Sequence, residues 1–171
     1  MDQDPDLSPA ETRDAFEARV KHAQREHERM DRAQVAMFPA VTGFAVEALK
    51  APALINGGAA AAMLAFVGTG RQPVTLDTIL GLKAFALGLV LAALATASAY
   101  FSQYFYLAHM RSTRHDWHHP FAIETTESRR AIRAGIGFHL FGIALVLAAY
   151  GCAAFGLWSV ASSLVPLAAK A

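Results

Sequence analysis

The chain has 171 residues, of which 54% are hydrophobic and only 17% are charged, and its mean hydropathy is +0.30. Soluble domains carry about 25% charged residues, so this composition favours a membrane protein. A net charge of +1 excludes the strong basic excess of a dedicated nucleic-acid binder. The single cysteine excludes an internal disulfide framework.

Charged residues are concentrated at the N-terminal end, where residues 1–50 hold 17 of the 29 Asp, Glu, Lys and Arg side chains. Residues 8–11 (SPAE) have the form of a capping box with proline at the first helical position, which predicts a helix that begins at Pro9. We expect residues 1–50 to form a long cytoplasmic helix that runs into the membrane. Pro39 and Pro52 predict kinks in it.

One face of this helix repeats at alternating steps of four and three residues, which is the spacing of a heptad seam. Its early members are Phe16, Val20, Ala23, His27, Met30 and Gln34. The stripe is narrow, and several members are too weakly apolar to hold a helix on a membrane surface. We therefore interpret it as a coiled-coil packing seam, within one chain or between copies. A helix lying on the membrane surface is the alternative.

Three stretches without Asp, Glu, Lys or Arg follow. Each is long enough to cross about 30 Å of hydrocarbon, which takes about 20 helical residues. They predict transmembrane helices at about residues 51–70, 80–110 and 134–160, so the expected fold class is all-α integral membrane, with a membrane domain over residues 51–171. The tail of the third stretch, with Pro166, is expected to leave the bilayer or to lie along it.

Twelve of the fifteen Lys and Arg residues precede the first span or lie between the second and third spans. Because short positively charged segments stay in the cytoplasm, we expect the N-terminus inside and the C-terminus outside.

Small residues recur at every fourth position of the spans, and such faces allow helices to approach closely. Gly57 and Ala61 have this spacing in the first span, and Gly88 and Ala92 have it in the second. Asn56 is expected to hydrogen-bond between helices, with a pore-lining or helix-breaking role as the alternative. Asn56, Gly57 and Ala61 are therefore predicted assembly residues, in addition to those of the heptad stripe.

His115, His118 and His119 would share one face of a helix and could there bind a metal ion. Their HxxHH pattern resembles one histidine box of the membrane fatty-acid desaturases and hydroxylases, which implies a di-iron centre. That family combines several such boxes, whereas this chain has seven histidines in total and no second HxxHH. The preferred interpretation is an interfacial loop in which Trp117 anchors at headgroup depth.

His109 ends the second span, and His139 lies six residues past Arg133 in the third. Two histidines on neighbouring antiparallel helices could ligate haem b or border a quinone site. A hydrogen bond from His139 to a polar side chain of the second span is the simpler interpretation.

The strings INGGAAAAMLAFVG and AYFSQYFY together resemble a pattern found in small bacterial inner-membrane proteins, over about a third of the chain. The resemblance implies the bacterial inner membrane as the location and implies no activity. We expect a non-enzymatic membrane protein that acts through assembly, as a homo-oligomer, which could form a pore, or as an accessory subunit of a larger complex. The partners expected are the lipid bilayer and further protein chains, with no nucleic acid. The alternative is a haem-, quinone- or metal-binding membrane subunit.

Overall fold

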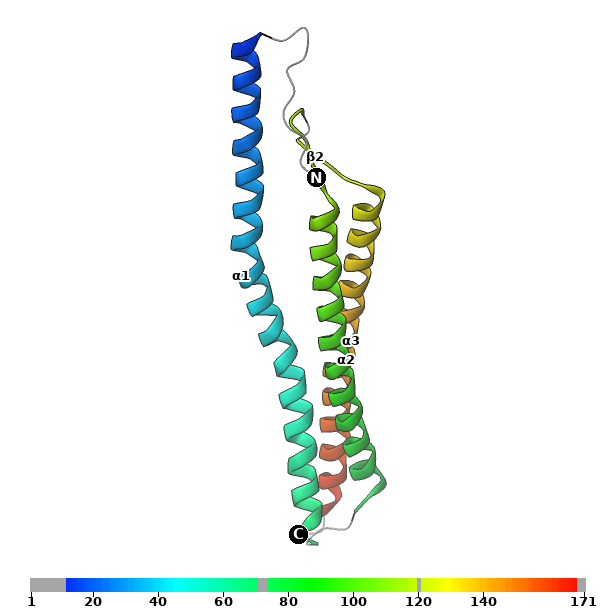
Figure 1. Cartoon of the computed structure of the whole chain (residues 1–171). Helices are drawn as coiled ribbons and strands as arrows, with labels where there is room; N and C mark the ends of the chain where they lie inside the picture. The colour runs from blue at the N-terminus through cyan, green and yellow to red at the C-terminus, as the bar shows by residue number, and fades with distance from the viewer. Residues whose placement is uncertain (1–11, 71–73, 120, 169–171) are drawn as a thin grey trace. The chain divides into compact units, whose positions relative to one another are not determined.

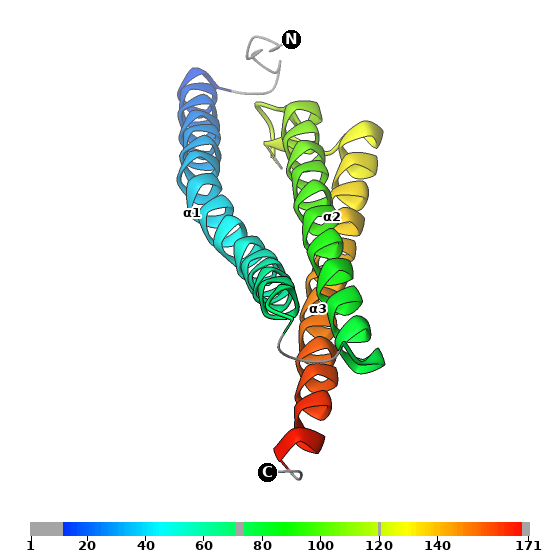
Figure 2. The same ribbon diagram turned by 90° about the horizontal axis from the view of Figure 1, so that it is seen from below.

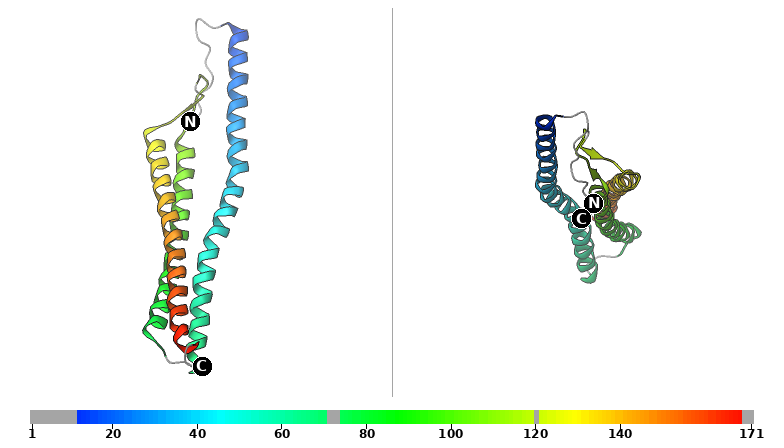
Figure 3. Two further views of the ribbon diagram at one scale, coloured as in Figure 1. Left: turned by 180° about the vertical axis from the view of Figure 1, so that it is seen from behind. Right: turned by 45° about the horizontal axis from the view of Figure 1, so that its top comes forward.

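The computed structural model describes residues 12–70, 74–119 and 121–168, and within them the chain is almost entirely helical (Figure 1). The helices are α1 (Arg13–Gly68), α2 (Leu76–Ser112) and α3 (Thr126–Ala168). Two strands of two residues each, β1 (Arg114–His115) and β2 (Ala122–Ile123), pair antiparallel between α2 and α3 (Figure 3). Apart from this small ribbon, the predicted all-α class is confirmed.

Each of the three helices begins with the same local device. A threonine just before the helix accepts a hydrogen bond through Oγ1 from the backbone N–H three residues later, and an acidic residue lies in the first turn. Both features stabilise the N-terminus, where backbone N–H groups lack helical partners. The threonine and the acidic residue are Thr12 and Asp14 in α1, Thr75 and Asp77 in α2, and Thr125 and Glu127 in α3. The predicted start at Pro9 lies outside the described residues.

Three helical stretches are long and apolar enough to cross a membrane, as the sequence predicts: Val46–Gly68, Leu76–Ser112 and Thr126–Ser163. The second has 37 residues and is therefore about 55 Å long, more than the hydrocarbon layer requires. Helix α3 continues through Pro166 to Ala168, and α1 continues through Pro39 and Pro52.

The chain divides into two compact units, which are described separately. Unit 1 consists of Met1–Gly43 and Gln103–Ile136, and unit 2 consists of Phe44–Ser102 and Gly137–Ala171. The charged N-terminal part of α1 therefore shares a unit with the α2–α3 connection.

In unit 2, α2 and α3 run side by side with small residues where they meet (Figure 2). Ala92 and Ala149 are fully buried or nearly so. A Cβ atom built on Gly156 would lie 2.8 Å from the Phe85 ring, so only glycine allows this approach. Ser98 Oγ donates a hydrogen bond of 2.7 Å to the Phe138 carbonyl oxygen. The core of unit 2 is therefore built on closely approaching helices, in agreement with the small-residue spacing.

Candidate functional site

The side chain of Asn56 is completely buried where the three helices of unit 2 meet. Its Nδ2 group donates to the Pro52 carbonyl oxygen within α1, at 2.8 Å, and to the Ala149 carbonyl oxygen of α3, at 3.1 Å. Because both partners only accept hydrogen bonds, the amide nitrogen must face them. Asn56 thus joins α1 to α3, which is the interhelical role expected from the sequence.

The other amide atom of this residue, Asn56 Oδ1, is buried with no conventional donor among the described residues. It lies against Gly88 of α2, where an added Cβ atom would collide with it. The missing side chain of Gly88 therefore makes room for the carboxamide, and the Cα–H group in place of that side chain points toward Oδ1 as a weak donor. Gly88 is a partner of Asn56 that the sequence interpretation did not pair with it.

In unit 1, the residues between α2 and α3 (113–125), here called the connecting segment, contact α1 through His27. The Nε2 atom of His27 lies 3.1 Å from the Asp116 carbonyl oxygen and 3.0 Å from the Phe121 carbonyl oxygen. Both are acceptors, so Nε2 carries the proton and donates to both. The His27 ring also packs edge-on against the rings of His115 and Trp117, at centroid distances of 4.7 and 5.6 Å.

Neighbouring positions of α1 add to this contact. The ring of His22 stacks on that of Phe121 at 5.3 Å, and Arg19 Nη1 donates to the Trp117 carbonyl oxygen at 3.0 Å. Ala23 is completely buried. Two residues of the early heptad stripe are thus accounted for within one chain, since His27 contacts the connecting segment and Ala23 is buried.

The remaining predicted assembly residues differ in their surroundings. Phe16, Val20 and Met30 are half-buried, and the side chain of Gln34 lies outside the described part. In unit 2, Gly57 faces Leu89 of α2, and Ala61 is exposed.

Phe121 has a backbone φ of 60°, the left-handed region that side chains other than glycine rarely adopt. Its N–H donates to the His118 carbonyl oxygen at 2.7 Å, and its own carbonyl oxygen accepts from the Asp116 N–H at 2.8 Å. This conformation costs about 1–3 kcal/mol, which the contacts of Phe121 with α1 help to offset. No glycine or asparagine in the sequence marks this turn.

The three histidines of the HxxHH string do not share a helical face, because this part of the chain is not helical. His115 lies in β1, and His118 and His119 lie in the bend that follows. Among the residues that the structure describes, no group of three His, Cys, Asp or Glu side chains is arranged to hold a metal ion. Asp116 instead accepts a hydrogen bond from the His118 N–H at 2.9 Å, which holds the pKa of its carboxyl group below the ordinary value.

His109 belongs to a hydrogen-bond network with Thr113 and Ser128 in unit 1, where α2 ends and α3 begins. Its Nδ1 atom lies 3.0 Å from the Ser128 carbonyl oxygen, so Nδ1 carries the proton, and it also contacts Ser128 Oγ at 2.7 Å. Thr113 Oγ1 lies 3.1 Å from that hydroxyl and donates to the His109 carbonyl oxygen. In the tautomer with the proton on Nδ1, the lone pair lies on Nε2. His139 is exposed and lies in unit 2, so the two candidate ligands belong to different units.

No family model matches the chain, and neither a curated protein nor a solved structure is similar to it.

Proposed function

We propose that this chain is a non-enzymatic membrane protein of the bacterial inner membrane that acts by assembly. The membrane part of α1 serves as its interface, in a homo-oligomer, which could form a pore, or in a larger complex. The Lys and Arg distribution supports an N-terminus in the cytoplasm and a C-terminus outside.

The observation that carries this proposal is an uncovered small-residue face of α1. Gly58, Ala61, Ala62 and Ala65 follow one another at helical spacing, and all four are exposed. A Cβ atom on Gly58 would meet nothing within 4 Å. The opposite face holds the buried Asn56.

In the most apolar 18-residue stretch of this span, only 17% is buried, which is the lowest share among the three candidate spans. In lipid no hydrophobic force brings helices together, so close packing of small residues is a main source of helix association. A further helix can pack against such small side chains more closely than lipid acyl chains can.

Disulfide crosslinking in native membranes tests the interface. In a chain whose Cys152 is replaced by alanine, single cysteines at Ala61 and Ala65 are expected to form homodimers on oxidation. A cysteine at Ala144, an exposed alanine of α3, serves as the matched control and is expected to remain monomeric. Ala62→Leu in the Ala61 cysteine variant is expected to suppress the crosslink, because the larger side chain separates the two helices.

A crosslinked product whose mass differs from that of a homodimer would support an accessory subunit in place of a homo-oligomer. No product at Ala61 or Ala65, with normal membrane insertion, would contradict assembly through this face.

A second candidate function, haem binding, is favoured by the geometry of His109. An axial haem ligand keeps its orientation through an Nδ1–H bond and binds iron through Nε2, and His109 has that proton arrangement. If this candidate is correct, the purified protein is expected to show a Soret band that His109→Ala removes. A protein without such a band, purified from haem-replete cells, would contradict it.

A further inference from the structure

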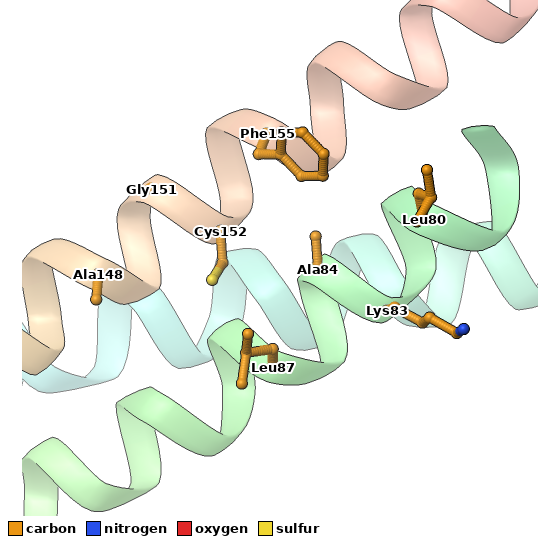
Figure 4. Close-up of a pocket in the computed structure, with 8 residues that line it drawn as sticks. All are labelled: Leu80, Lys83, Ala84, Leu87, Ala148, Gly151, Cys152 and Phe155. Carbon is orange, nitrogen blue, oxygen red and sulfur yellow. The ribbon is translucent and has the colours of Figure 1, made fainter. Parts of the chain in front are cut away.

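A groove of about 410 Å³ lies between α2 and α3 in unit 2 (Figure 4). It is lined by four residues of each helix, and seven of the eight are apolar or small. Leu87 of α2 and Phe155 of α3 are its larger lining residues, and Gly151 of α3 lines it without a side chain. Most of the lining residues are exposed, so the groove opens at the surface of unit 2. Its volume falls in the range of about 300–1,000 Å³ typical of ligand sites.

The eighth lining residue is Lys83 of α2, the only charged residue between positions 78 and 110. The uncharged run of the second span begins directly after it, which places Lys83 at the boundary between headgroups and hydrocarbon. Figure 4 shows its ammonium group extending toward the N-terminal end of α2, away from Leu87. The apolar part of the groove therefore continues from this boundary to hydrocarbon depth.

Lys83 has no acidic partner in the described part of the chain. The part of α3 in unit 2 contributes none, because residues 137–168 contain no Asp or Glu. The other lysine of the described part of unit 2, Lys50, is paired with Glu47 at 2.8 Å. A cation beside an apolar groove is complementary to a molecule that joins an anion to a hydrocarbon chain.

We propose that this groove binds one anionic phospholipid, with an acyl chain between α2 and α3 and the headgroup phosphate on the Lys83 ammonium. The groove supplies apolar contact that any phospholipid could use, and Lys83 supplies the preference for net negative charge.

Native mass spectrometry of the detergent-solubilised full chain, with equal amounts of phosphatidylglycerol and phosphatidylcholine, tests the site. The wild-type chain is expected to retain one phosphatidylglycerol in preference to phosphatidylcholine. Lys83→Gln is expected to reduce that preference by about five-fold, the effect of one basic residue near the membrane surface. Lys83→Arg is expected to preserve it, and Lys50→Gln to leave it unchanged because Lys50 already has a partner.

The groove itself is tested by filling it. A Cβ atom on Gly151 would meet nothing within 4 Å, so Gly151→Leu is expected to fold and to block lipid retention. Gly137→Leu is the matched control, since Gly137 lies on the same helix with the same free space and does not line the groove. Equal retention of both lipids by the wild-type chain would overturn the proposal. So would an unchanged preference in Lys83→Gln, or retention in Gly151→Leu equal to that in Gly137→Leu.

Discussion

Gly88→Ala is expected to destabilise the helices of unit 2 by about 2 kcal/mol, within the usual cost of overpacking a core. The added Cβ atom would collide with the carboxamide of Asn56. This side chain is short and is held by two hydrogen bonds from Nδ2, so it cannot move aside without losing them. Unfolding in mixed detergent micelles, followed by circular dichroism, measures the loss.

The pairing of Gly88 with Asn56 is tested by a double-mutant cycle. Asn56→Ala alone is expected to cost about 1–2 kcal/mol through its lost hydrogen bonds. The double variant is expected to be more stable than the sum of the single effects by about 1 kcal/mol or more, because the new methyl group fills space that the carboxamide leaves. Gly57→Ala is the control, since its Cβ atom would make an ordinary 3.7 Å contact with Leu89. Additive single effects would contradict the pairing.

His27→Leu is expected to loosen the connecting segment, because it removes the only side-chain donor that the described structure places on the Asp116 and Phe121 carbonyl oxygens. A loss of about 1–1.4 kcal/mol corresponds to a five- to ten-fold increase in opening. Hydrogen–deuterium exchange of the Asp116 and Phe121 amides, both hydrogen-bonded within the segment, measures this change.

Arg25→Leu, an exposed substitution on the same helix, is expected to leave the exchange unchanged. The experiment also separates the two forms of the packing seam, within one chain and between copies. If copies of the chain paired through His27, leucine would strengthen their association, since a polar residue in a heptad core lowers stability. Stronger association with unchanged exchange of the segment would therefore contradict the intramolecular contact.

The histidine-rich string shows why spacing alone misleads. The i, i+3, i+4 pattern places His115, His118 and His119 on one face only if the backbone is helical. The positive φ of Phe121 is not marked by glycine or asparagine, and the residues of α1 that contact this turn, His22 and His27, lie about a hundred positions earlier.

The amino-acid order was enough to predict the helical class and three spans, because hydrocarbon thickness sets a run length that can be counted along one chain. It also marked Asn56 as an interhelical residue, since a buried amide in a span needs a partner. Which partners it meets was decided by the rotation of each helix about its axis. That rotation brings Gly88 and the Ala149 carbonyl oxygen to the amide and leaves Ala61 outside. Helix rotation depends on how all side chains pack at once, and no local pattern of residues specifies it.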